Sequence, residues 1–242
     1  MSRTLVIGDI HGALKALKEV LKKAQVTKDD KLIFLGDYVD GWSDSAKTLD
    51  YLITLQKSHH CMILKGNHDA LLLHWLIHQE QNEKWLMHGG RSTLQAYKNI
   101  NKTHKTIHQK FIENLPTYHV DDQNRLFVHA GFANMHGPDY EYYENTVYWD
   151  RTLWEMALAT DKKLSQNDVT YPKRLKLFKE IYIGHTPVNR YGKDIPMQAQ
   201  NVINLDTAAA YKGPLTILDV DSKKYWQSTP VHKLYPDENG RN

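Results

Sequence analysis

The sequence predicts an α/β fold in which a central sheet is covered by helices on both faces. The first third of the chain repeats one pattern: a short apolar strand, a polar loop that contains glycine, and a stretch of helical periodicity. These strands are expected at residues 4–7, 32–35 and 62–64. Short, uniformly apolar strands that alternate with helices are typical of a sheet that is buried on both faces.

The first predicted helix follows the strand at residues 4–7. Its apolar side chains recur at the spacing of a single helical face: Leu14, Leu17, Val20, Leu21 and Ala24. A second apolar segment, residues 71–77, follows the third strand and is expected to form a buried helix.

The rest of the chain continues the alternation. Further strands are expected at residues 125–128, 181–183, 202–205, 215–220 and 225–228. Residues 74–116 are rich in Trp, His, Gln and Lys with weak helical periodicity, so we expect a helical, cap-like excursion over the site. Residues 237–242 are polar, and we expect a frayed tail. We interpret residues 1–242 as a single domain.

Composition narrows the class of protein. The net charge of +3 is small beside 31 basic and 28 acidic residues, so it indicates neither a nucleic acid nor a membrane partner. The single cysteine, Cys61, cannot form an internal disulfide, which fits a reducing compartment. No apolar run approaches the roughly 18 residues of a membrane span, and the chain begins without a leader-like segment, so we expect a cytoplasmic protein.

Five predicted strands each end in a loop that carries Asp, His or Asn. These residues are Asp9 and His11, Asp37 and Asp40, Asn67 and His68, His129, and His185. Loops at one set of strand ends converge on a common crevice, so the side chains are expected to meet there. Carboxylate, amide and imidazole donors without thiolate suit Mn, Fe or Zn, of which we favour Mn. Two such ions can clamp both oxygens of an in-line displacement at phosphorus.

Five motifs occur in a fixed order: Gly8–Gly12, Gly36–Gly41, Gly66–Asp69, His129–Gly131 and Gly184–Pro187. Together they resemble the phosphoprotein-phosphatase branch of the calcineurin-like metallophosphoesterases, over about residues 4–220. The resemblance implies a four-layer sandwich of central β-sheets flanked by helices. It also implies two divalent metal ions, and an enzyme in which activated water attacks phosphorus directly.

The resemblance further implies a role for each strand-end residue. One ion would be held by Asp9, His11 and Asp37, and the other by Asp37, Asn67, His129 and His185. Asp37 is then the bridge between the ions. His68 would protonate the leaving oxygen, and Asp40 would orient the His68 imidazole.

One departure concerns the phosphate-binding arginine. Proteins of the resembled branch carry Arg and Gly after Gly-Asp-x-Val-Asp, whereas this chain has Gly41, Trp42 and Ser43. Arg151 and Arg91 are the candidates to bind phosphate in its place. Trp42 either lines the cleft or packs in the core.

Several residues outside the motifs have both a functional and a structural interpretation. Asp206 is interpreted as a partner that orients a ligating histidine, and Asp69 and Asp150 as possible helix caps. Clustered aromatic residues either pack or form a wall against a nucleobase: Tyr140, Tyr142, Tyr143, Tyr148 and Trp149. Ten histidines match no motif and are interpreted as surface or capping residues: His59, His60, His74, His78, His88, His104, His108, His119, His136 and His232.

Three functions compete. The first is a phosphomonoesterase similar to bacterial and phage Ser/Thr protein phosphatases, whose partner would be a phosphorylated protein. The second is a hydrolase similar to the symmetrical diadenosine tetraphosphate hydrolases, because residues 85–90 with Thr93 and Leu94 look like the cap of that group. The third is an inactive scaffold. The complete ligand set disfavours the scaffold, because buried carboxylates and imidazoles without metal are costly.

Overall fold

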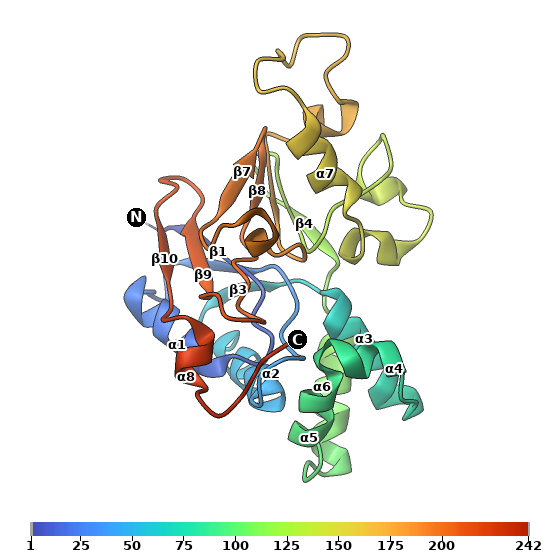
Figure 1. Cartoon of the computed structure of the whole chain (residues 1–242), viewed down its shortest axis with the longest axis vertical. Helices are drawn as coiled ribbons and strands as arrows, with labels where there is room; N and C mark the ends of the chain where they lie inside the picture. Colours follow the sequence, from blue (N-terminus) through green and yellow to red (C-terminus); the bar gives the residue numbers. More distant parts are fainter. Residues whose placement is uncertain (1, 242) are drawn as a thin grey trace.

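A computed structural model describes residues 2–241 and contains two five-stranded sheets (Figure 1). The first sheet has the order β10-β9-β1-β2-β3. Its strands are β1 (Thr4–Ile7), β2 (Lys31–Phe34), β3 (His60–Ile63), β9 (Thr216–Asp219) and β10 (Tyr225–Gln227). β1, β2 and β3 run parallel, whereas β9 is antiparallel to both β1 and β10.

The second sheet has the order β4-β5-β6-β8-β7. Its strands are β4 (Tyr118–Val120), β5 (Arg125–Val128), β6 (Glu180–Ile183), β7 (Met197–Ala199) and β8 (Val202–Asn204). The three central strands are parallel, and the edge strands β4 and β7 pair antiparallel. Both edge strands are only three residues long and were not predicted from the sequence.

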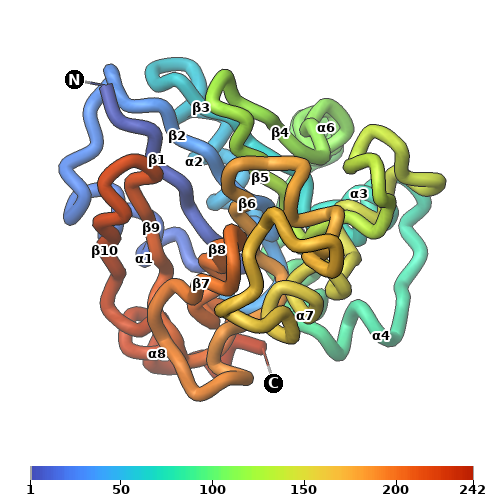
Figure 2. Tube along the Cα trace, turned by 90° about the horizontal axis from the view of Figure 1, so that it is seen from above, coloured from blue at the N-terminus to red at the C-terminus, as the bar shows by residue number. Residues whose placement is uncertain are grey.

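The two sheets pack face to face through alternate residues of their strands. Val6 of β1 and Ile33 of β2 meet Phe127 of β5 and Tyr182 of β6 in one buried cluster. Neighbouring residues such as Leu5 point the other way, toward the helices. Helices cover both outer faces, so the expected four-layer α/β sandwich is confirmed. Seen from above, the strands of the two sheets follow two neighbouring arcs (Figure 2).

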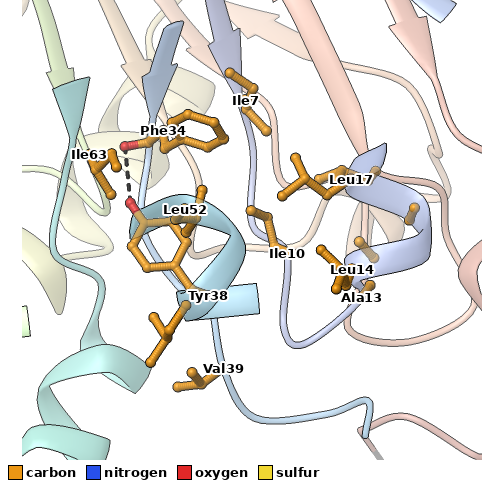
Figure 3. Packing of buried hydrophobic residues seen from close by; sticks show 14 of the residues in the cluster. Ile7, Ile10, Ala13, Leu14, Leu17, Phe34, Tyr38, Val39, Leu52 and Ile63 are labelled. Atoms are coloured by element: carbon orange, nitrogen blue, oxygen red, sulfur yellow. Dashed lines mark hydrogen bonds between the residues drawn. The ribbon is translucent and has the colours of Figure 1, made fainter. Parts of the chain in front are cut away.

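Helices α1 (Leu14–Lys23) and α2 (Ser45–Leu55) cover the outer face of the first sheet. The predicted face of α1 is the buried one: Leu17 points toward Ile7, and Leu14 lies near Ile10 (Figure 3). The outer face of the second sheet is covered by α7 (Thr152–Ala159).

The expected excursion is helical. It comprises the end of α3 (Asn67–His78), then α4 (Glu83–Trp85), a kinked segment at Leu86–Gly90 in which His88 and Gly89 leave helical geometry, α5 (Arg91–Ala96) and α6 (Lys102–Glu113). The interpretation of residues 71–77 as a buried helix is only partly right, because Leu72, Trp75 and Leu76 are buried but Ile77 is exposed.

The C-terminal segment differs from the frayed tail that we expected. After α8 (Val231–Leu234), the Glu238 carboxylate accepts hydrogen bonds from the Ser43 backbone N–H at 2.9 Å and hydroxyl at 2.6 Å. The Arg241 N–H donates to the carbonyl of Ala210 at 2.8 Å. These bonds hold residues 238–241 against the loop that follows β2 and against the segment between β8 and β9. Residue 242 lies outside the described residues.

No helix in the described part of the chain combines the length and apolar character that crossing a membrane requires.

Candidate metal centre and substrate cleft

The predicted site residues follow the carboxyl ends of strands in both sheets. β1 leads to Asp9 and His11, and β2 leads to Asp37. β5 leads to His129 and β6 to His185. The backbone has φ values of 51°, 57° and 65° at His11, Asp37 and His185, which residues other than glycine rarely adopt. Strained backbone of this kind gathers at functional sites, where the surrounding structure compensates for it.

The structure brings the predicted metal ligands together around Asp37. Its Oδ2 lies 3.5 Å from His11 Nε2 and 3.4 Å from His129 Nε2. Asn67 Oδ1 lies 3.0 Å from His129 Nε2 and 2.9 Å from His185 Nδ1. Asp37 therefore stands between two groups of donors, as a bridging ligand must.

Asp9 completes the first group. Its Oδ2 lies 3.9 Å from His11 Nε2 and accepts a hydrogen bond from the His185 backbone N–H at 3.0 Å. Asp9 Oδ1 and His185 Nε2 are both buried and have no hydrogen-bond partner among the described residues. Unpaired buried polar atoms are rare and costly, and their presence beside the carboxylate and imidazole donors fits a site that holds a cation.

Hydrogen bonds from the far edges of two imidazoles fix their tautomers. His11 Nδ1 lies 2.8 Å from the carbonyl of Asp40, and His129 Nδ1 lies 2.9 Å from the carbonyl of Leu35. Carbonyl oxygens only accept, so each Nδ1 carries a proton, and each Nε2 is the ring nitrogen that faces Asp37 and would bind a metal. Burial lowers the pKa of His11 and of His185 well below the usual value, which keeps both imidazoles neutral.

His129 shows that the centre attracts positive charge. Burial lowers its pKa, but the Asp37 carboxylate outweighs burial and raises the pKa to about 9. Carboxylate, amide and imidazole donors are a set suited to divalent transition metals. The residues therefore fit two ions, of which one would be held by Asp9, His11 and Asp37 and the other by Asp37, Asn67, His129 and His185.

His68 and Asp40 form the hydrogen-bonded pair that the sequence predicted. His68 Nδ1 lies 2.7 Å from Asp40 Oδ2, and both side chains are buried. The excursion holds Asp40 in place, because Thr93 Oγ1 donates to Asp40 Oδ1 and Trp85 Nε1 donates to Asp40 Oδ2, each at 2.6 Å. The His68 backbone N–H donates to Asp37 Oδ1 at 2.9 Å.

Three aspartates with two interpretations in the sequence, Asp69, Asp150 and Asp206, hydrogen-bond to backbone N–H groups. Asp69 is buried and accepts hydrogen bonds from the backbone N–H groups of Asp37 at 2.8 Å and Tyr38 at 2.9 Å. Asp150 accepts from the Leu153 N–H at the start of α7, so it is a cap. Asp206 accepts from the Ala208 N–H, and no hydrogen bond links it to a histidine among residues 2–241.

A cleft of about 590 Å³ opens beside the metal centre. Asp37, Asn67, His68 and His185 line its floor. Its walls carry four basic side chains, which we call the basic rim: Lys84, Arg151, Arg190 and Arg241. Burial and the guanidinium groups of Arg190 and Arg241 lower the pKa of Arg151, so the three arginines lie near one another.

The structure separates the two arginines proposed from the sequence. Arg151 lines the cleft with the metal centre, whereas Arg91 lines a neighbouring hollow with Gly41 and Ser92. Trp42 does not line the cleft. Its side chain is fully buried, donates through Nε1 to the carbonyl of Ala209 at 2.7 Å and stacks on Tyr235.

Only one of the five clustered aromatic residues borders the cleft. Trp149 lines it, together with Trp85 and Tyr211, which were not predicted. Tyr142 and Tyr143 are exposed and lie outside the cleft.

Arg241 was missed, because the sequence around it carries no motif. Its Cγ lies 3.5 Å from the place where a Cβ on Gly41 would stand and 3.0 Å from the equivalent place on Gly89. The two side-chain-free residues thus leave room for the arginine stem. Arg241 Nε is buried without a partner among the described residues. The one related feature in the sequence was Gly41, which stands where the resembled proteins carry an arginine.

The fold and the donor set define a two-metal phosphoesterase. The family model for calcineurin-like phosphoesterases matches residues 2–221, and the chain belongs to this family. It is 27% identical over 235 residues to the asymmetrical bis(5'-nucleosyl)-tetraphosphatase PrpE of Oceanobacillus iheyensis, covering 91% of this chain and 89% of that protein.

Two solved structures share the fold. One, provisionally described as a diadenosine tetraphosphatase, aligns with a TM-score of 0.62 at 23% identity, over 93% of this chain and 92% of that chain. A cold-active protein tyrosine phosphatase aligns with a TM-score of 0.61 at 13% identity, over 94% of this chain and 78% of that one. Proteins described by different substrates share this fold, so the substrate must be argued from the cleft.

Proposed function

We propose that this hydrolase cleaves a phosphoanhydride bond of a dinucleoside tetraphosphate, and that it does so asymmetrically. The observation that carries the proposal is the gathering of Arg151, Arg190 and Arg241 in one cleft beside the metal centre. The positive charges of Arg190 and Arg241 lower the pKa of Arg151. Guanidinium groups held this close to one another are expected to bind a polyanion, which neutralises their repulsion. The PrpE relative, named as an asymmetrical tetraphosphatase, supports this substrate class.

The basic rim favours a phosphate chain over a single phosphoryl group. A phosphoserine or phosphothreonine offers one phosphoryl group, and two metal ions already engage its oxygens. Each arginine can make two parallel hydrogen bonds to phosphate oxygens. Three arginines therefore have more donors than one phosphoryl group can accept, whereas a tetraphosphate supplies acceptors along the whole rim. We accordingly place the dinucleotide ahead of the phosphoprotein that the sequence favoured.

The chain's own residues divide the chemical work. The two ions, for which we favour Mn²⁺, would polarise the phosphoryl oxygens and lower the pKa of the attacking water. His68 is tied to Asp40 through Nδ1, which leaves Nε2 to protonate the departing oxygen. Because Thr93 and Trp85 fix Asp40, the excursion sets the orientation of His68.

Trp149 is proposed to stack against one nucleobase. Its side chain is 45% exposed and lies edge-on to His185, with 6.2 Å between ring centroids. An aromatic face at the border of a phosphate cleft binds bases of any identity, because every base has a π face. The proposal therefore predicts a preference for dinucleotides without a strong preference among bases.

Turnover of three substrates tests the proposal: diadenosine tetraphosphate, p-nitrophenyl phosphate and a phosphothreonine peptide. We expect kcat/KM for the dinucleotide to exceed that for the peptide by on the order of 100-fold, which corresponds to about two charge-assisted hydrogen bonds. Chromatography of the products identifies the bond that is cut. AMP with ATP supports asymmetrical cleavage, ADP alone contradicts it, and a preference for the peptide overturns the substrate class.

A further inference from the structure

A second group of metal-type donors lies away from the cleft, between α2 and α6. Asp50 Oδ1 lies 2.6 Å from His104 Nε2 and 3.1 Å from His108 Nε2. The three donor atoms all lie within 4.8 Å of one another. We propose that Asp50, His104 and His108 form a separate binding site for a divalent transition metal such as Zn²⁺.

The two histidines have the spacing that a helix needs to present both imidazoles to one ion. They are four residues apart on α6, and their ring centroids are 4.7 Å apart. His108 is fully buried, although the sequence suggested a surface or capping residue. A buried imidazole whose Nε2 meets a carboxylate from another helix is a more constrained arrangement than a surface pair.

Tyr97 prepares His108 for a metal. Its hydroxyl lies 2.6 Å from His108 Nδ1, the ring nitrogen that faces away from Asp50. When Nδ1–H donates to this hydroxyl, Nε2 presents a lone pair toward Asp50. Without a metal, the Nε2 proton binds Asp50 Oδ1 instead and the tyrosine hydroxyl donates to Nδ1. When a cation binds at Nε2, the imidazole proton therefore moves from Nε2 to Nδ1, and the tyrosine hydroxyl changes from donor to acceptor.

The distances are close to those of a tetrahedral site. Ligand bonds to Zn²⁺ of about 2.0–2.1 Å place neighbouring ligand atoms roughly 3.3 Å apart. The observed separations require only a slight opening at His104, which is partly exposed and free to move. Asp50 is also partly exposed, so solvent can supply a fourth ligand. Two imidazoles and one carboxylate suit Zn, Ni, Co or Cu rather than Mg or Ca.

His74 and His78 of α3 provide a natural comparison. They are also four residues apart, with ring centroids 4.6 Å apart. The carboxylate nearest to His74 is that of Glu80, at 3.4 Å, and its side chain is 74% exposed. Among residues 2–241, no third donor meets both imidazoles there, and both histidines are exposed as expected. This pair therefore serves as the control.

The site would join helices that support the catalytic pair. α2 begins at Ser45, whose hydroxyl lies 3.0 Å from that of Thr93, a partner of Asp40. Tyr97 directly follows α5, the helix that carries Thr93. A metal between α2 and α6 would thus hold the excursion against the sandwich and raise the stability of the fold.

Metal content and thermal stability test the proposal in the full chain. Wild type, His104→Ala and His74→Ala are stripped of metal, incubated with Zn²⁺ and desalted, and zinc is measured by mass spectrometry. We expect wild type and His74→Ala to retain one more zinc per chain than His104→Ala. The rise in Tm that this zinc produces should also be missing only from His104→Ala.

Two further variants separate metal binding from a folding defect. Tyr97→Phe keeps the ring but loses the hydroxyl, so zinc affinity at this site should fall by about 10- to 100-fold. Asp50→Asn retains the shape of the side chain and should lose the extra zinc while keeping a native circular dichroism spectrum. Equal zinc content in wild type and folded His104→Ala would overturn the proposal, whatever the phosphatase activity.

Discussion

The metal centre and the basic rim border the same cleft but are built differently. The ligands of the centre come from short loops that directly follow strands, and hydrogen bonds such as that from His11 to Asp40 fix their rings. The arginines of the rim come from three segments far apart in the sequence, and Arg241 belongs to the C-terminal segment, whose backbone is hydrogen-bonded to Ala210. The comparison indicates that strand ends position the metal ligands, whereas loops and the C-terminal segment supply the cations that we propose select the substrate.

The largest effect is expected from Asp37→Asn, at the middle of the metal centre. The carboxylate that lies within 3.5 Å of His11 and His129 would become an amide, which cannot bridge two cations as strongly. A loss of several kcal/mol of metal interaction lowers kcat by about 1,000-fold or more. Metal analysis and turnover check this, with the exposed Asp122→Asn as a control. Full activity in Asp37→Asn would contradict a metal mechanism.

The second prediction concerns His68, at the boundary between the centre and the rim. His68→Ala should retain both metals but lose about 100-fold or more in kcat on diadenosine tetraphosphate, because a positioned general acid is missing. p-Nitrophenolate leaves without protonation, so p-nitrophenyl phosphate should be affected far less. An equal loss on both substrates would show that His68 does not donate the proton.

The sequence predicted the metal centre because each ligand lies in a local motif at the end of a strand. The carboxyl ends of parallel strands in one sheet share an edge, which groups the loops after β1, β2 and β3 and, in the other sheet, the loops after β5 and β6; packing of the two sheets then brings both groups together. The strand pattern predicted a sheet with cover on both faces, and the family resemblance implied the four-layer sandwich. The edge strands β4 and β7 were missed because three residues give too short a pattern.

Of the basic rim, the sequence suggested only Arg151, because tertiary packing decides which side chains line the cleft. Trp42 directly follows the loop of Asp40, yet Tyr235 and the carbonyl of Ala209 draw its side chain into the core. Arg241 stands at the far end of the chain, and its approach depends on space beside Gly41. His108 lies on a polar helix, so its burial could not be read from its neighbours.

Arg241→Ala sharpens the comparison within the rim. Loss of a charge-assisted pair of hydrogen bonds to phosphate, worth about 1.5–3 kcal/mol, should lower kcat/KM on the dinucleotide by about 10- to 100-fold. The metal content should not change. Arg91→Ala is the matched control, because Arg91 lies in the neighbouring hollow, and its kcat/KM should stay within about twofold of wild type. The reverse order of effects would return Arg91 to the site.

The smallest effect is expected from Ser43→Ala, which weakens the attachment of the tail without touching the cleft. The Ser43 hydroxyl donates to Glu238 at 2.6 Å on the exposed side of the tail. Loss of one such bond costs about 1 kcal/mol, which would free the Arg241 segment part of the time and raise KM by up to about fivefold. In an Arg241→Ala background the same change should have no further effect on KM, because the arginine that the tail positions is already gone. Additive effects in the double variant would mean that Ser43 acts on the cleft by another route.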